Sequence, residues 1–366
     1  MAVPLFDTMR PVAPLRAQID ARIAAVLDGG AFVLGPEVEA FERELAAYLG
    51  VGHVVSVANG TDAITIALQA LGVGPGDEVV VPAFTFYASA EAIPPTGAAP
   101  VFCDVDPDTM VVTAETVRAA LTPRTKAVVA VDLFGNPAPV PEIEALGVPV
   151  VEDAAQAAGS LLAGRRTAAL GTVGTLSFFP SKNLGCFGDG GAIATDDDAV
   201  AELARVYRFH GSRDKVSYER VGWNSRLDEL QAAILRVLLG RLDRWCDGRR
   251  AAHAAYGAAG LWELAAPQAP TAGSDPAWGL QVVRTPHARL LEEALPAAGI
   301  GARAYYRTPL HRQPALAPWS AGVELPATDA LAESHLAIPM GPLLDAADAA
   351  EVAAAARAAL DGAAAA

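Results

Sequence analysis

Short apolar runs alternate with segments of helical periodicity from about residue 53 to residue 211. In the first such segment, Ile64, Ala67 and Leu68 fall on one stripe of a helix, and Gly72 follows as a stop signal. Alternation of this kind is typical of parallel strands joined by crossover helices. We therefore expect an α/β fold, with a mostly parallel sheet covered by helices on both faces. The predicted strands cover residues 53–58, 78–82, 100–105, 126–131 and 149–153.

The flanks of this region predict further helices and a second domain. Two helices are expected at residues 14–28 and 36–49, packed on the edge of the sheet or on the other domain. Past residue 226, apolar residues from Leu227 to Leu242 recur at helical spacing, which predicts one long helix that leads into a smaller set of elements. The predicted division is a large domain over residues 1–240 and a small α/β domain over residues 241–366.

Composition indicates a globular protein of the cytoplasm. Hydrophobic residues make up 52% of the 366 residues, enough for a sizeable core. A net charge of -15 would repel nucleic acid, so no such partner is expected. The chain shows no secretory signal pattern and no run of about 18 apolar residues, so no membrane partner is expected. The three cysteines form no Cys-x-x-Cys pair, and no two histidines stand at i, i+4 spacing, so neither disulfides nor a metal site is expected.

Lys182 is the first candidate for chemistry. The chain has only three lysines, and this one lies in the apolar, glycine-rich run from Leu176 to Gly191. A desolvated lysine loses its proton readily and can condense with a carbonyl, whereas arginine is far harder to deprotonate. For a lysine taken alone, a position in which the side chain reaches from a strand edge to water is the more common alternative. The neighbouring motifs have to decide between the two.

A candidate phosphate site follows the first predicted strand. The turn Asn59-Gly60-Thr61 leads into a helix, so it offers free backbone N–H groups, a hydroxyl and the positive end of a helix dipole. A capped helix start explains the same residues equally well. The glycine cluster from Gly72 to Asp77 follows a helix instead of a strand, and a tight turn is the better interpretation of it.

Acidic and aromatic candidates lie after two other strands. Asp153 ends an apolar run, where a buried carboxylate is costly unless it meets a cation, and it could hold the nitrogen of a pyridine ring protonated. Gln156 could reach the phenolic oxygen of such a ring. Phe86 could supply a flat face against the ring. For each residue alone, helix capping or core packing is the more common role.

Together these residues supply an amine, a phosphate seat, an acid and an aromatic plate, which is the set that pyridoxal 5'-phosphate requires. Over roughly its whole length the chain also resembles the sugar aminotransferase family named after DegT, DnrJ, EryC1 and StrS, within the fold-type I pyridoxal-phosphate enzymes. The resemblance implies a mostly parallel seven-stranded sheet between helices and a smaller C-terminal α/β domain. The motifs that carry it are Asn59-Gly-Thr-Asp62, Pro82-Ala-Phe-Thr-Phe86, Glu152-Asp-Ala-Ala-Gln156, Ser177-Phe-Phe-Pro-Ser-Lys-Asn-Leu-Gly185, Gly188-Asp-Gly-Gly191 and Gly222-Trp-Asn-Ser-Arg-Leu-Asp-Glu-Leu-Gln231.

The resemblance also implies a role for each matching residue. Lys182 would form the Schiff base with the cofactor, Asp153 would pair with the pyridine nitrogen, and Gln156 would contact the ring oxygen. Phe86 would stack on the ring. Asn224 would reach the phosphate of the neighbouring subunit, so the family's active site implies a homodimer. The phosphate itself is assigned to Gly60, Thr61 and Ser177.

The implied reaction moves an amino group from L-glutamate or L-glutamine to a nucleotide-linked keto sugar. The expected acceptor is a dTDP-4-keto-6-deoxyhexose aminated at carbon 4 in secondary-metabolite biosynthesis, with amination at carbon 3 or of a keto inositol as alternatives. A dehydratase of this fold would carry histidine in place of Lys182, and the complete residue set argues against a non-catalytic regulator. One departure is Ala158, where many relatives have histidine. The expected contacts to sugar and diphosphate are Arg213, Lys215, Tyr306 and His311.

Overall fold

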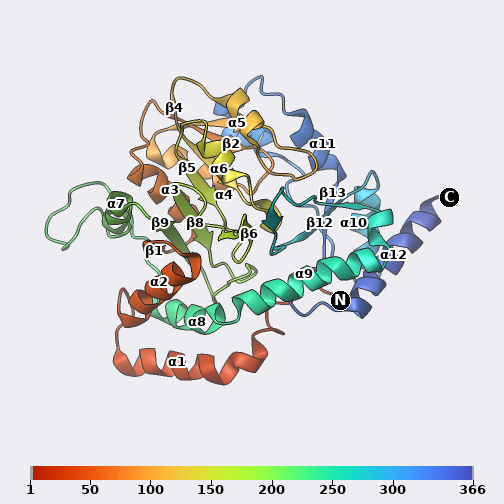
Figure 1. The fold of residues 1–366 in the computed structure, drawn as a ribbon, viewed down its shortest axis with the longest axis horizontal. Helices are drawn as coiled ribbons and strands as arrows, with labels where there is room; N and C mark the ends of the chain where they lie inside the picture. The colour runs from red at the N-terminus through yellow and green to blue at the C-terminus, as the bar shows by residue number, and fades with distance from the viewer. Residues whose placement is uncertain (1–2, 365–366) are drawn as a thin grey trace.

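A seven-stranded sheet forms the centre of the molecule (Figure 1) in a computed structural model that describes residues 3–364. The strand order is β1-β9-β8-β5-β4-β2-β3. Only β9 runs antiparallel to its neighbours, so the sheet is mostly parallel, as the alternation of strands and helices predicts. The strands are β1 (His53–Val57), β2 (Glu78–Pro82), β3 (Ala99–Cys103), β4 (Thr125–Val131), β5 (Val150–Asp153), β8 (Val173–Ser177) and β9 (Gly191–Thr195).

Helices flank this sheet, and one of them is buried along most of its length. Helix α3 contacts both strands and helix α7, so its residues from Ala63 to Leu68 are inaccessible to solvent. Because α3 begins at Gly60, soon after β1 ends at Val57, the burial of this helix holds the turn between them in place. The α-helices are α1 (Arg16–Gly29), α2 (Pro36–Leu49), α3 (Gly60–Ala70), α4 (Ala88–Glu91), α5 (Ala114–Ala120), α6 (Val140–Glu144), α7 (Asp198–Arg208), α8 (Glu229–Leu239), α9 (Leu242–Ala258), α10 (Ala288–Ala297), α11 (Pro326–Ser334) and α12 (Ala346–Ala364).

The single long helix expected after residue 226 is in fact two helices, α8 and α9. The two helices are separated at Gly240 and Arg241, whose ψ angles of -4° and -8° depart from the helical value of about -42°. Glycine has low helix propensity, which favours a break at this point. Leu242 is nevertheless buried, so the apolar stripe continues across the break and periodicity could not reveal it. Helices α1 and α2 pack against α8, and α2 also contacts the edge strand β1.

A second, smaller sheet lies in the C-terminal part of the chain. It is antiparallel and contains β10 (Ala266–Pro267), β12 (Gln281–Arg284) and β13 (His335–Ile338). Helices α10 and α12 pack together beside it around a separate apolar cluster. A third sheet joins the two regions, because β11 (Ser274–Asp275) pairs with β6 (Leu161–Leu162), which pairs with β7 (Arg165–Arg166).

The domain division at residues 240 and 241 remains a prediction. The outer ends of both predicted domains, residues 1–2 and 365–366, lie outside the described residues. Between residues 3 and 364, none of the helices combines the length and the apolar character needed to cross a bilayer.

Candidate active site at the carboxyl ends of the strands

The turn after β1 forms the amino end of helix α3. Asn59 caps the helix, because its Oδ1 accepts a hydrogen bond of 2.8 Å from the amide of Asp62. The amides of Gly60 and Thr61 belong to the first turn and have no acceptor within the helix. A Cβ atom on Gly60 would lie 2.8 Å from the Cβ of Ser177, so only glycine permits this approach. The structure therefore brings Gly60, Thr61 and Ser177 together at the positive end of the helix dipole, where an anion is stabilised.

Glu152 and Asp153 occupy consecutive positions of β5 and so point to opposite faces of the sheet. Both carboxylate oxygens of Glu152 bind backbone amides: they accept hydrogen bonds from Ala168 at 2.7 Å and from Leu170 at 2.8 Å. The neighbouring Asp132 is also fully buried, and burial together with Glu152 raises its pKa. Glu152 is thus a structural acid, and Asp153 is the acid that faces the candidate site.

Asp153 and Lys182 influence each other across the site. Asp153 is buried, and its Oδ2 accepts a hydrogen bond of 2.7 Å from the Ser89 hydroxyl. Burial raises the pKa of Asp153, while the Ser89 hydrogen bond and the Lys182 charge oppose the increase. Desolvation lowers the pKa of Lys182, and Asp153 opposes that change. A carboxylate and an amine with these shifts are typical of functional sites.

Gln156 belongs to a cluster with several aromatic rings. Its Oε1 accepts from the amide of Phe134 at 2.8 Å, and its Nε2 donates to the Tyr306 hydroxyl at 3.1 Å. Tyr306 stacks on Phe134 with ring centroids 5.9 Å apart. Phe86 lies 6.5 Å from Tyr306 between centroids but is 54% exposed, so one face of its ring is free to contact a ligand. The cluster holds Gln156 in one orientation at the rim of the site.

Three other predicted residues lie on the loop between α7 and α8, which projects from the body of the molecule (Figure 1). Arg213 is exposed, and its Nε lies 2.9 Å from Glu219 Oε1. Lys215 is exposed over the ring of Phe209, with Nζ 4.8 Å from the centroid. Asn224 is exposed and pairs with Phe209 only through the backbone. Among residues 3–364, none of the three side chains forms a hydrogen bond or ion pair with the residues around Lys182.

His311, the remaining candidate for a sugar contact, lies in the interior. Its residue is 3% exposed, and Nε2 lies 3.1 Å from Asp329 Oδ1. Burial lowers the pKa of this imidazole, and Asp329 opposes the decrease. A buried side chain in this position contributes to packing, so a direct contact with a sugar would require the surrounding residues to move.

The depression beside the helix α3 turn is acidic. It has a volume of 430 Å³, and Asn59 and Thr61 line it together with Asp62, Glu91 and Asp189. No lysine or arginine from the described part of the chain lines this depression. A phosphate group in it would therefore need cations from elsewhere.

Two functional candidates were missed by reasoning from the sequence. Ser89 binds Asp153, but 64 positions separate them and nothing distinguishes this serine from the others. Phe134 orients Gln156 through its amide and adopts a positive φ of 62°. Such a conformation is uncommon for a phenylalanine; the following Gly135-Asn136-Pro137 indicates a turn but does not indicate that Phe134 adopts it.

Comparison with known proteins places these residues in context. The profile of the DegT/DnrJ/EryC1/StrS aminotransferase family matches residues 14–357. The dTDP-3-amino-3,4,6-trideoxy-alpha-D-glucose transaminase of Streptomyces venezuelae is 45% identical over 94% of this chain and 92% of its own length. The pleiotropic regulatory protein of Geobacillus stearothermophilus is 42% identical over 94% of this chain and 95% of its own length.

The fold also matches a solved structure along nearly its whole length. The crystal structure of S. venezuelae DesV in complex with a ketimine intermediate superposes with a TM-score of 0.94 at 44% identity, covering 97% of this chain and 98% of that chain. The predicted fold class is thereby confirmed.

We expect borohydride reduction of the protein loaded with pyridoxal phosphate to leave a pyridoxyl group on Lys182. Because burial lowers its pKa, the neutral amine that condenses with an aldehyde persists at lower pH than the ordinary lysine value of 10.5 permits. Covalent uptake of the cofactor by the apoprotein should accelerate with pH and level off below pH 10.5. Peptide mass analysis locates the adduct, and absorbance gives the pH profile. An adduct confined to Lys126 or Lys215 would contradict the assignment.

Asp153→Asn should reduce turnover about 100-fold or more, because removal of one preorganised electrostatic contact commonly costs ~10²–10³ in rate. Ser89→Ala keeps the carboxylate and removes one hydrogen bond, so its effect should be much smaller. Steady-state kinetics of both variants, with thermal unfolding as a check on folding, test this order. Equal effects in the two variants would show that the hydrogen bond, and not the charge of Asp153, matters.

Proposed function

This chain belongs to the DegT/DnrJ/EryC1/StrS aminotransferase family, and we propose that it transfers an amino group from L-glutamate or L-glutamine to carbon 3 of a nucleotide-linked keto sugar. Its membership makes it an aminotransferase that uses pyridoxal phosphate, which confirms both predictions from the sequence. The acceptor and the residue roles are our proposals. The single observation that carries the residue roles is the burial of the Lys182 amine near the Asp153 carboxylate, where each charge opposes the pKa shift of the other group.

The residues in place fit this cofactor. Gly60 and Thr61 present amides without helical acceptors at the amino end of α3, and Gly60 allows Ser177 to pack against this turn. Phe86 has an exposed ring face, and Asp153 is an acid at the end of a strand with a hydroxyl partner. We propose that Gly60, Thr61 and Ser177 hold the phosphate, Phe86 covers the ring, and Gln156 contacts the ring oxygen.

When bound, pyridoxal phosphate supplies an aldehyde that condenses with amines and a ring that accepts electrons. Lys182 would anchor the group covalently and, once freed by the donor, would move the donor's α-proton to the cofactor; in the second half-reaction it would carry out the reverse transfer, to the acceptor carbon. Its lowered pKa favours the neutral amine that proton abstraction requires. Asp153 would keep the ring nitrogen protonated, because a buried carboxylate is stabilised by an adjacent positive charge.

Carbon 3 is favoured by the name of the S. venezuelae relative, a transaminase of a 3-amino sugar at 45% identity. The sequence-based preference for carbon 4 is not confirmed, and carbon 4 becomes the second candidate. One relative, at 42% identity, is named as a regulatory protein, so the tests below also distinguish catalysis from regulation. The Lys182 and Asp153 pair favours catalysis, since ligand sensing alone does not need a neutral amine.

We propose that the enzyme is a homodimer with shared sites. The loop between α7 and α8 exposes Val216 at 83% and Val221 at 93%, and apolar groups exposed to this extent often mark an interface. The same loop carries Arg213 and Lys215, whereas the depression beside Thr61 is lined by acids alone among its charged residues. A loop from a second copy would bring these cations, and Asn224, to the phosphate groups.

Purified protein should form 2-oxoglutarate from L-glutamate fastest with a 3-keto nucleotide sugar. The assay compares matched 3-keto and 4-keto nucleotide sugars and a keto inositol at equal concentration. Lys182→Ala should fold but lose turnover by about 10³-fold or more, within the range for loss of a general acid–base and covalent group. Higher activity with the keto inositol would indicate an aminocyclitol synthase, and no turnover with any acceptor would indicate a regulator.

Complementation in mixed dimers tests the shared site. Lys182→Ala and Asn224→Ala protomers should each be nearly inactive alone. In a mixed dimer, one site would have both intact residues if Asn224 acts across the interface, so random mixing should restore about a quarter of wild-type sites. No restoration, with light scattering showing that mixed dimers form, would place Asn224 in the site of its own chain.

A further inference from the structure

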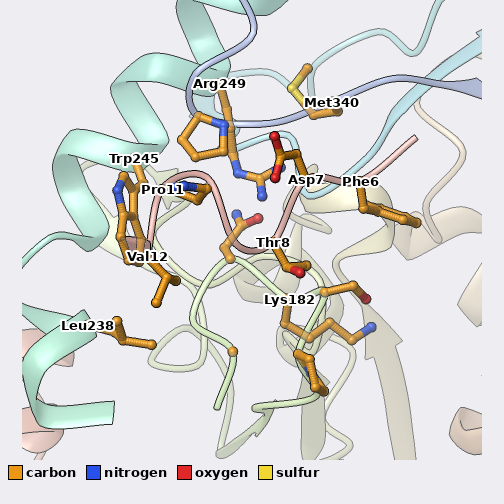
Figure 2. Close-up of a pocket in the computed structure, with 15 residues that line it drawn as sticks. Phe6, Asp7, Thr8, Pro11, Val12, Lys182, Leu238, Trp245, Arg249 and Met340 are labelled. Carbon is orange, nitrogen blue, oxygen red and sulfur yellow. The ribbon is translucent and has the colours of Figure 1, made fainter. Parts of the chain in front are cut away.

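A small cavity lies beside Lys182, between the N-terminal segment at residues 6–12 and helix α9 (Figure 2). Its volume is 40 Å³. This is room for about three water-sized spheres, taking ~10–15 Å³ for each. Besides apolar side chains, the walls contain charged groups from three parts of the chain, namely Asp7, Lys182 and Arg249. The cavity is distinct from the acidic depression beside Thr61, with which it shares no residue.

Arg249 is the unusual member of this wall. It is 7% exposed, and its Nη1 donates to the carbonyl groups of Trp278 at 3.2 Å and Gly279 at 3.3 Å. No other hydrogen bond and no ion pair of this guanidinium occurs within residues 3–364. Burial lowers the pKa of Arg249 to about 10, so it remains charged at neutral pH. A buried charge without a counterion is costly, and an anion in the cavity would offset that cost.

The next residue, Arg250, differs from Arg249 in its acidic partners. Arg250 lies on the same helix, and its Nη1 lies 3.0 Å from Asp247 Oδ1 while its Nε lies 2.6 Å from Asp275 Oδ1. It therefore has two acidic partners, whereas the more deeply buried Arg249 has none among residues 3–364. This difference makes the free donors of Arg249 available to a ligand, and it makes Arg250 a matched control.

Two polar groups share the cavity with Arg249. Figure 2 shows the Asp7 carboxylate next to the Arg249 guanidinium, but the two form no ion pair within 4.0 Å, and Asp7 Oδ1 accepts from the amide of Arg10 at 3.0 Å. Asn183 Oδ1 is buried and has no hydrogen-bond partner in the described part of the chain. An amino acid carries both an anion for the guanidinium and N–H donors for such an acceptor.

We propose that this cavity binds a carboxylate of the amino donor, with Arg249 as the cation that recognises it. The inference rests on the proposed aminotransferase function, because Lys182 lines the same cavity and is the residue with which the donor must exchange. A planar guanidinium suits a carboxylate better than an ammonium does, since it can donate two parallel hydrogen bonds. Arg249 is thus a residue for donor specificity, separate from the residues proposed for the sugar nucleotide.

The test uses glutarate, a dicarboxylate that has no amine and so cannot react. Calorimetric titration of the cofactor-loaded protein should give a dissociation constant about tenfold or more higher for Arg249→Gln than for wild type, the scale expected for loss of a charged hydrogen bond. Arg249→Lys should show a smaller increase, and Arg250→Gln should show none. In kinetics, Arg249→Gln should raise the KM for L-glutamate while the KM for the keto sugar is unchanged.

An unchanged glutarate affinity in Arg249→Gln would overturn the proposal, as would an equal increase in the KM of both substrates accompanied by a lower unfolding temperature. If Arg249→Gln does not fold, Arg249→Lys decides, because it retains the positive charge and loses the paired hydrogen bonds. Asp7→Asn removes a competing negative charge and should tighten glutarate binding; weaker binding would contradict the proposal. Glutarate binding does not depend on turnover, so failure of the proposed sugar reaction would be seen separately.

Discussion

The site depends on one electrostatic constraint, the burial of an amine and a carboxylate near each other. Desolvation acts on the two groups in opposite directions, raising the pKa of Asp153 and lowering that of Lys182, and each charge opposes the shift of the other. Burial therefore favours the neutral form of both groups, and the charge of each group favours the ionised form of the other. This balance holds only while β5 and the chain after β8 stay in register, since these segments carry the two residues.

The charge on the rest of the surface fits this arrangement. The protein is strongly acidic overall, and the depression beside Thr61 contains only acids among its charged lining residues. The projecting loop carries Arg213 and Lys215, and Arg249 lines the cavity beside Lys182. Under our proposals, substrates with phosphate or carboxylate groups would meet positive charge at these two separate places. This separation would allow an amino donor and a sugar nucleotide to be recognised independently although they use the same reactive centre.

Sequence patterns predict the sheet and single out Lys182 and Asp153 as candidates, because strand alternation and rare residue types are local signals. Contacts between residues far apart in the sequence leave no such signal: Ser89 meets Asp153, and Tyr306 meets Gln156, only after folding. The break between α8 and α9 is hidden because Leu242 continues the buried stripe. Glu152 and Asp153 stand next to each other in one sequence motif. Side chains along a strand point alternately to its two faces, so only Asp153 faces the candidate site. In the sequence nothing distinguishes Arg249 from the other arginines, because its burial arises only in the folded chain.

The contact between Gly60 and Ser177 has a mechanical consequence. Gly60 in the first turn of α3 packs on the Ser177 side chain at the end of β8, because glycine adds no side chain of its own to this contact. Lys182 follows Ser177 by only five positions, so a displacement of this strand would carry the helix end and the lysine together. The proposed phosphate anchor and the proposed attachment point of the ring are thus both tied to the carboxyl end of β8.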